Sequence, residues 1–202
     1  MVEIAEHGFG ATELDPELLA TPFRVQTNWH VITGGACCGK TTLIDLLAER
    51  GFQTLPEIPR QYIEREVAKG RTLDELFASV ADERAITDWQ RRAEHGLRPA
   101  DVVFLDRALP DFLWPWRLHG LDPNELLAAC LHHRYASVYI LDLLPLELDG
   151  ARIPDDTFTV VFDEWLVHDY SALGYRVVRV PVLSPQERVE FVLERLSEQG
   201  LV

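Results

Sequence analysis

The chain has 202 residues, 47% of them apolar, which suits one globular domain and excludes a mostly disordered protein. Only 19 Lys and Arg stand against 33 Asp and Glu, giving a formal net charge of -14. A broad nucleic-acid surface needs clustered cations, so we do not expect nucleic acid as a partner.

The sequence also excludes several locations and site types. No stretch approaches the ~20 apolar residues of a membrane span, so we expect no spanning helix. The acidic start MVEIAEHGFG lacks the basic-then-apolar pattern of a signal peptide. The three cysteines, Cys37, Cys38 and Cys130, have no metal-binding spacing and are typical of a reducing compartment. We therefore expect a cytoplasmic protein.

Residues 1–28 carry weak signals and are interpreted as an N-terminal extension of a domain over 29–202. Short apolar segments predict buried strands at 29–33, 52–55, 101–106, 136–142 and 175–180. Amphipathic segments predict helices at 40–50, 56–69, 72–95, 109–119, 123–132, 157–173 and 184–197. Thr72 and Glu75 form a capping-box pattern at the start of the third of these helices. Strands that alternate with helices indicate a parallel sheet covered on both faces, hence an α/β domain.

A phosphate-binding loop lies between the first strand and the first long helix. The pattern is Gly-x-x-x-x-Gly-Lys-Thr, in which backbone N–H groups and the helix N-terminus surround nucleotide phosphates. Lys40 is expected to reach the β- and γ-phosphates of ATP or GTP, and the Thr41 hydroxyl to ligate Mg²⁺. The expected nucleotide-binding residues of the loop are Gly34, Gly35, Ala36, Cys37, Cys38, Gly39, Lys40, Thr41 and Thr42.

A second group of candidates follows the strand over 101–106. Asp106 ends that strand, at the position where this class of fold holds Mg²⁺. The next residue is Arg107, whereas motor-type ATPases commonly have Glu there to activate water. Arg107 therefore favours charge neutralisation around a transferred phosphoryl group.

Glu57 and Arg60 follow the second strand. Glu57 could act as general base or hydrogen-bond acceptor for a substrate hydroxyl, with Arg60 holding an anionic or ribose group. The alternative is an ordinary intrahelical ion pair at the start of a helix.

Three further candidates depend on their surroundings. Arg152 lies in the Pro- and Gly-rich loop from Leu143 to Asp156, where it could reach the transition state or remain solvated. Gln90 could read a nucleobase or lie on the surface. Trp114-Pro115-Trp116 could line a substrate pocket or belong to the core.

The ordered segments GGACCGKTTLIDLLAERGF, PEIPRQYIERE, VVFLDRALPD and YRVVRVPVLSPQERVEFVLERL resemble a known family. They resemble the AAA-type P-loop ATPase/kinase family related to the ribosylnicotinamide kinase domain of NadR. More distantly, they resemble the deoxynucleoside and thymidylate kinases. The resemblance covers roughly residues 31–196 and implies a three-layer P-loop α/β/α sandwich with a mostly parallel five-stranded sheet and a small lid.

The resemblance also implies roles for individual residues. Glu57 matches the acidic residue near the phosphoryl acceptor, and Arg60 and Arg107 match substrate- and phosphate-side arginines. Asp111 matches the last acid of the Asp-Arg-x-Leu-x-Asp motif and is placed with the substrate-binding residues. Pro181 matches the loop near the nucleotide base. Members often carry paired lid arginines, of which only Arg152 is kept here.

Two functions follow from these patterns. The first is a kinase that transfers the γ-phosphoryl group of Mg-ATP to a hydroxyl of a nucleoside-like or other small metabolite. The second is a nucleotide-dependent switch or regulatory ATPase or GTPase with a protein or lipid partner. Acceptor-stimulated turnover separates them. A homodimer is the working expectation for the assembly.

Overall fold

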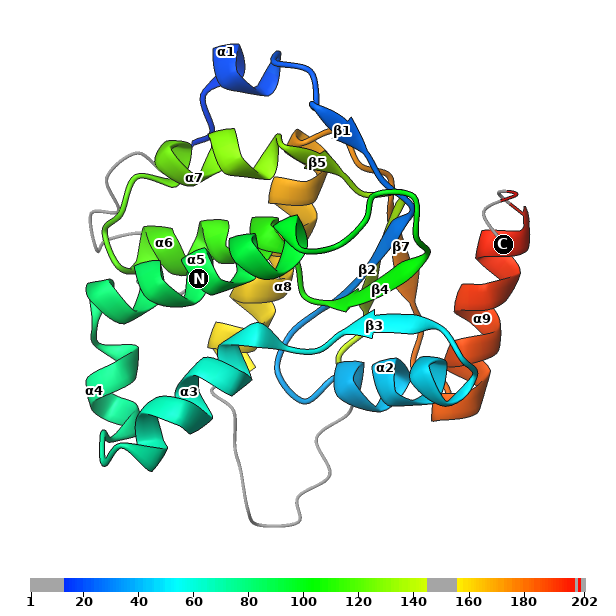
Figure 1. Ribbon diagram of the computed structural model, residues 1–202, viewed down its shortest axis with the longest axis horizontal. Helices are drawn as coiled ribbons and strands as arrows, with labels where there is room; N and C mark the ends of the chain where they lie inside the picture. The colour runs from blue at the N-terminus through cyan, green and yellow to red at the C-terminus, as the bar shows by residue number, and fades with distance from the viewer. Residues whose placement is uncertain (1–12, 145–155, 199, 201–202) are drawn as a thin grey trace.

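The computed structural model describes residues 13–144, 156–198 and 200, and within these residues five parallel strands form the main sheet (Figure 1). Their order across the sheet is β3-β4-β2-β6-β7. The strands are β2 Trp29–Thr33, β3 Gln53–Leu55, β4 Val103–Asp106, β6 Ser137–Leu141 and β7 Val177–Val180. The predicted five-stranded parallel sheet is therefore confirmed.

Helices cover both faces of this sheet, because successive residues of each central strand point to opposite sides. Val31 packs in one hydrophobic core and Ile32 in the other. Helices α2 and α9 cover one face, and α5 to α8 cover the other (Figure 1). The helices of the sandwich are α2 Lys40–Glu49, α3 Ile58–Ala68, α4 Leu73–Phe77, α5 Val80–His95, α6 Leu113–Leu118, α7 Pro123–Cys130, α8 Asp156–Ala172 and α9 Pro185–Glu198. The result is the predicted three-layer sandwich.

The helix expected over 72–95 is two helices, so this part of the prediction is wrong. The capping box forms as expected, since the Glu75 N–H donates to Thr72 Oγ1 at 3.3 Å. The chain then leaves the helix after Phe77, and Ser79 caps a new one by accepting from the Asp82 N–H at 3.2 Å. The second cap lets α4 turn away from α5 and form one end of a pocket described below.

The segment from residue 13 to 28 packs against the domain. It contains the short helix α1 Pro16–Leu19 and the strand β1 Val25–Gln26, which pairs in parallel with β5 His133–Arg134. Leu14 is buried in the core beneath it. The sequence signals of this segment are weak, and neither short strand was predicted.

The carboxyl ends of all five strands meet at one edge of the sheet. Parallel strands place their following loops together, and in open α/β sheets ligands bind at this edge. The turn after β2, Asp106 at the end of β4 and Glu57 just beyond β3 therefore converge. At the carboxyl end of the sheet, η2 (Leu109–Phe112) continues the turn after β4 into α6.

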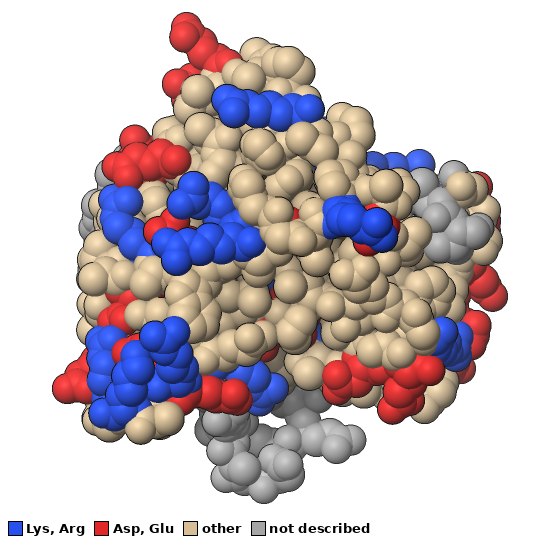
Figure 2. All heavy atoms as spheres, viewed as in Figure 1, with Lys and Arg blue, Asp and Glu red and all other residues tan. Residues whose placement is uncertain are grey.

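On the face shown in Figure 2, basic and acidic side chains are interspersed around a wide uncharged area. Within the described ranges, no helix is both long enough and apolar enough to cross a membrane.

Candidate functional site

The turn from β2 into α2 is a tight loop that only glycine permits at several positions. Gly34 and Gly39 have φ angles of +141° and +89°, which other residues rarely adopt. A Cβ atom at Gly35 would lie 2.6 Å from Cγ2 of Thr159 on α8. Among the described residues no side chain caps α2, so its first N–H groups face the loop and are available to phosphate oxygens.

Lys40 is buried beneath this loop. Its ammonium group donates to the carbonyl oxygens of Gly34 at 3.1 Å and Gly35 at 2.7 Å. Burial, and secondarily the positive charge of Arg107, lowers its pKa. A triphosphate would give this ammonium a stronger, charged acceptor than the loop carbonyls.

Thr41 and Asp106 form the best-matched pair for a hard cation. The Thr41 hydroxyl donates to Asp106 Oδ2 at 3.2 Å, while the other carboxylate oxygen of Asp106 is buried and accepts no bond from any described residue. Burial, and then the nearby charge of Glu57, raises the Asp106 pKa to about 6. A buried carboxylate oxygen without a donor, beside a hydroxyl, has the chemistry of a Mg²⁺ site. Within the described ranges no cluster of three or more His, Cys, Asp or Glu could hold a metal.

Arg107 is held between two carboxylates. Its Nε donates to Glu57 Oε1 at 3.0 Å, and a terminal nitrogen lies 3.6 Å from Asp111 Oδ2. Burial favours a raised pKa at Glu57, but the charges of Arg107 and Lys40 outweigh it and the pKa is lowered. Glu57 is therefore ionised at neutral pH. Asp111 in turn accepts hydrogen bonds from Thr33 and Tyr170. These bonds fix the Asp111 carboxylate, which helps to fix the position of the Arg107 guanidinium.

A buried network sets the backbone of Arg107, which has a φ of +72° although it is not glycine. The Gln90 side-chain amide donates to the Arg107 carbonyl at 3.3 Å and to Glu94 at 3.0 Å. Glu94 also accepts from the Leu109 N–H at 2.9 Å. Gln90 is fully buried, so the surface alternative considered from the sequence is wrong, and its observed contacts position Arg107. Glu94 was missed, although Gln90 and Glu94 share one helix face at a spacing of four.

Arg188 on α9 joins the loops around the nucleotide position. Its guanidinium donates to the carbonyl oxygens of Cys38, Pro181 at 3.0 Å and Asp142 at 3.2 Å. Only 3% of the residue is exposed. The sequence did not single out Arg188, because an arginine in the first turn of a helix has no distinctive pattern.

A cavity of about 220 Å³ opens beside the phosphate loop. Its wall runs from Ala36 of the loop, past Glu57, Arg107 and Asp111, to α4, α5 and the end of α6. Trp114, Phe158 and Phe162 form an aromatic side of the cavity, and Trp114 lies 4.7 Å from Phe158 between ring centroids. Trp114 is thus both a core residue and part of the pocket wall, so both interpretations considered from the sequence apply to it.

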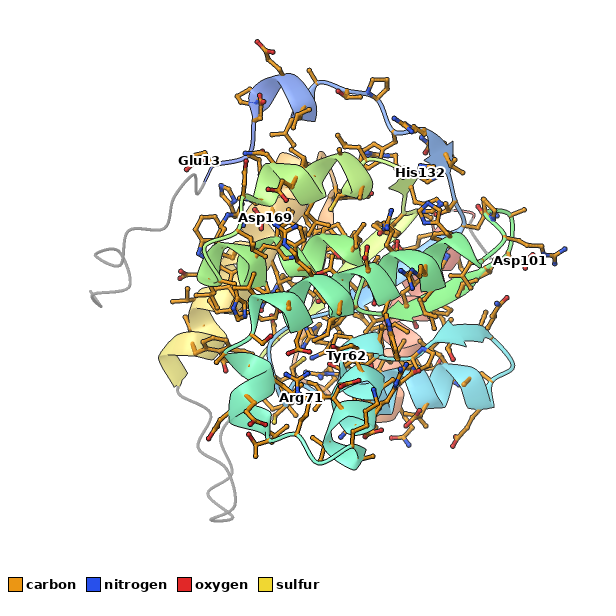
Figure 3. The ribbon with its side chains drawn as sticks, turned by 60° about the vertical axis from the view of Figure 1, so that its left-hand side comes forward. Glu13, Tyr62, Arg71, Asp101, His132 and Asp169 are labelled. Atoms are coloured by element: carbon orange, nitrogen blue, oxygen red, sulfur yellow. The ribbon has the colours of Figure 1, made fainter. Side chains whose placement is uncertain are left out.

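Two ion-pair networks hold the helices of this wall. Asp82 of α5 accepts from Tyr62 of α3 and, at 2.7 and 2.6 Å, from Arg71 in the turn before α4, and Tyr62 and Arg71 lie near one another in Figure 3. Asp169 of α8, which lies above Tyr62 and Arg71 in Figure 3, pairs with Arg117 of α6 at 2.6 and 2.9 Å. The walls are therefore tied to one another by charged groups and not by apolar contact alone.

The remaining sequence candidates are scattered. Arg60 is exposed and pairs with Glu64 at 3.5 Å, and Glu57 pairs with Arg107, so the alternative of an ion pair between Glu57 and Arg60 does not form. Glu57, the residue before α3, faces the site, whereas Arg60 in the first turn of α3 points to solvent. In the loop, Cys37 is exposed and Cys38 is buried. Arg152 lies outside the described residues.

The fold and this loop define a class of protein: the P-loop nucleotide-binding proteins of the three-layer α/β/α type. A family model described as "AAA domain" matches residues 29–188, and the chain belongs to that family. The resemblance recognised in the sequence is therefore confirmed.

Solved structures of several kinases share the fold. A NadR protein in complex with NR has a TM-score of 0.64 and 21% identity, over 85% of this chain and 51% of its own, so the chain spans about half of that protein. A thymidylate kinase from Ehrlichia chaffeensis has a TM-score of 0.58 and 15% identity, over 87% of this chain and 100% of its own. A shikimate kinase from Aquifex aeolicus has a TM-score of 0.53 and 16% identity, over 86% of this chain and 98% of its own. No curated protein matches the chain.

Proposed function

We propose that the protein is a kinase that transfers the γ-phosphoryl group of Mg-ATP, or Mg-GTP, to a hydroxyl of a nucleoside-like or other small metabolite. The observation that carries this proposal is the position of Glu57 and Arg107. Both side chains line the cavity together with Ala36 of the phosphate loop, so a hydroxyl bound there would meet a phosphoryl group held by that loop.

The phosphate side of the reaction belongs to the loop and its neighbours. Lys40 and Arg107, with Arg152 as a further candidate, would stabilise the charge on the transferred group. Thr41 and Asp106 would hold Mg²⁺, which supplies charge neutralisation at the phosphate oxygens. Pro181 would lie near the nucleotide base, where its carbonyl already anchors Arg188.

The acceptor side belongs to Glu57, with Asp111, which also lines the cavity, as a further candidate. Gln90 contributes through its contact with Arg107, and Arg60 points to solvent and is not among the residues that line the cavity. Glu57 accepts a hydrogen bond from the acceptor hydroxyl and orients its oxygen toward the γ-phosphorus. That oxygen forms a bond to the γ-phosphorus while the bond to the β–γ bridging oxygen breaks and the nucleoside diphosphate leaves. The hydroxyl proton passes to the Glu57 carboxylate and then to water.

The test is phosphoryl transfer from Mg-ATP and Mg-GTP to a panel of hydroxyl compounds. NR is the first to include, because a NadR protein of the same fold was solved with it. Glu57→Gln should lower kcat for transfer by ~100-fold or more, because it removes the proton acceptor. Glu64→Gln is the matched control, since Glu64 is exposed on the same helix.

Two results would contradict the proposal. Transfer unchanged in Glu57→Gln would remove Glu57 from the reaction. Nucleotide binding that no acceptor stimulates would favour the nucleotide-dependent switch instead. The cytoplasmic location and the homodimer stay predictions.

A further inference from the structure

Glu83 is a buried carboxylate at the end of the cavity formed by α4, α5 and α6. It lies in the first turns of α5 and lines the cavity with Leu76, Phe77 and Ile86. Its side chain is only 12% exposed. Glu83 is thus placed among apolar groups, where a carboxylate has a high cost unless it is paired.

No described residue donates a hydrogen bond to Glu83 Oε1, although this atom is buried. The other oxygen lies 3.9 Å from Nε2 of His119, which is too long for a direct hydrogen bond. Burial raises the pKa of Glu83 to about 7, and burial lowers the pKa of His119. Buried polar groups are nearly always paired in native proteins, so a carboxyl group that lines a cavity, with neither oxygen hydrogen-bonded to a described residue, calls for a partner from outside the chain.

The two ends of the cavity differ in their electrostatic surroundings. Glu57 is surrounded by Arg107 and Lys40, which lower its pKa. At Glu83 the pKa is raised by burial, and no charged group among the described residues opposes the shift. Glu83 therefore lies outside the set of residues that we propose to act in phosphoryl transfer.

Carboxyl groups outnumber cations on the cavity wall. Among the lining residues that the structure describes, Glu57, Glu83 and Asp111 are acidic, whereas Arg107 is the only Lys or Arg. Arg107 already pairs with Glu57 and Asp111. An anionic group deep in this cavity would meet carboxylates and no free described cation, which leaves its charge unpaired.

We propose that Glu83 and His119 form the recognition end of the acceptor pocket and select an acceptor that presents a nitrogen hydrogen-bond donor, neutral or cationic, on an apolar or aromatic body. This deepens the proposed function, on which it rests, by naming the class of acceptor. The acceptor's hydroxyl lies at Glu57 and its N–H group at Glu83, with the body against Trp114 and Phe162. Acceptors that carry a phosphate or carboxylate at that end are excluded.

A binding measurement tests this selection without any catalysis. Benzamidine and benzoate are aromatic probes of similar size, one a cationic nitrogen donor and the other an anion. At about pH 8, where Glu83 is mostly ionised, ligand-observed NMR should show benzamidine binding the wild-type protein about tenfold or more tightly than benzoate, since a charged hydrogen bond is gained in one case only. Glu83→Gln should remove most of that preference, while Glu194→Gln, which changes an exposed residue of α9, should keep it.

The wild-type result alone can overturn the inference. Benzoate binding as tightly as benzamidine, or neither probe binding, contradicts it, whether or not the Glu83 variant folds. A preference that survives in a folded Glu83→Gln protein assigns the selectivity to other residues and also overturns it.

The transfer assay separates this inference from the proposed function. In Glu83→Gln we expect KM for a nitrogen-bearing acceptor to rise about tenfold, whereas Glu194→Gln should leave it unchanged. Turnover of no acceptor, with the probe preference intact, would reject the kinase and keep the donor-selective cavity. Turnover that favours anionic acceptors would keep the kinase and reject the selection.

Discussion

Replacing Glu94 by Gln should stabilise the protein at neutral and alkaline pH but not in acid. The carboxyl group of Glu94 is fully buried and accepts from Gln90, from the Leu109 N–H and, at 2.8 Å, from the Tyr135 hydroxyl. A glutamine can keep all three contacts if its nitrogen donates to the Tyr135 oxygen. It then resembles the protonated form of Glu94.

The magnitude follows from the pKa. Burial raises the Glu94 pKa from 4.5 to about 7, against the opposing effect of its three hydrogen bonds. Below pH 4.5 the group is protonated in both the folded and the unfolded chain and contributes no difference. As pH rises toward 7, the unfolded chain ionises first, so wild-type stability falls. Above that range the wild-type free energy of unfolding is lower by a constant ~3 kcal/mol. The Gln variant does not lose this free energy, because its side chain does not ionise.

Denaturant unfolding followed by tryptophan fluorescence measures this difference across the range from about pH 4.5 to about pH 8. The free energies of unfolding of wild type and Glu94→Gln should coincide in acid and diverge as pH rises, with the variant above. Glu194→Gln controls for loss of a surface charge. Curves that stay parallel throughout would refute the assignment of a protonated Glu94 in the folded protein.

Three further outcomes are expected. Arg107→Lys keeps the charge but loses the planar guanidinium that contacts both Glu57 and Asp111, so kcat for transfer should fall by ~100-fold with little change in Kd for ATP. A fall in kcat matched by an equal loss of ATP affinity would contradict a role in transfer. Arg188→Lys should lower the free energy of unfolding by ~2 kcal/mol and weaken ATP binding, because one ammonium cannot reproduce the guanidinium's contacts with three carbonyls. Calorimetry measures ATP binding and thermal unfolding measures stability, and an unchanged Tm would contradict the role of Arg188 in joining these loops. Iodoacetamide should alkylate Cys37 and spare Cys38 and Cys130, which are buried, and Mg-ATP should slow the reaction; peptide mass spectrometry reads the sites, and labelling unaffected by Mg-ATP would place the nucleotide elsewhere.

The central sheet and the nucleotide loop were predictable because their signals are local. Each main strand is a short apolar run between turn residues, and the loop motif has a glycine where the backbone requires one. The break at Ser79 was not predictable from periodicity, since a polar residue at that position also fits a continuous helix. The strands β1 and β5 have two residues each, too few to show a pattern.

The candidate site divides in the same way. Glu57, Asp106 and Arg107 follow strand ends, and the parallel topology brings such positions together. Glu83, Glu94 and Arg188 lie within helices, and whether they face the site depends on how those helices pack. Arg60 shows the limit of spacing arguments, because it lies three residues from Glu57 and still points to solvent.

The packing of the segment before β2 sets where the cooperative folding unit begins. Leu14 contributes to the core, and the Asp15 N–H donates to Asn124 Oδ1 of α7 at 2.8 Å. The rings of Phe23 and Tyr175 pack edge to face, with their centroids 5.6 Å apart. A truncated protein that starts at Trp29 would retain the whole nucleotide loop and the whole family match. It would also uncover apolar surface on α7 and leave β5 without its partner, which promotes self-association. We therefore expect the smallest autonomously folding unit of this chain to be larger than the region that the family model matches.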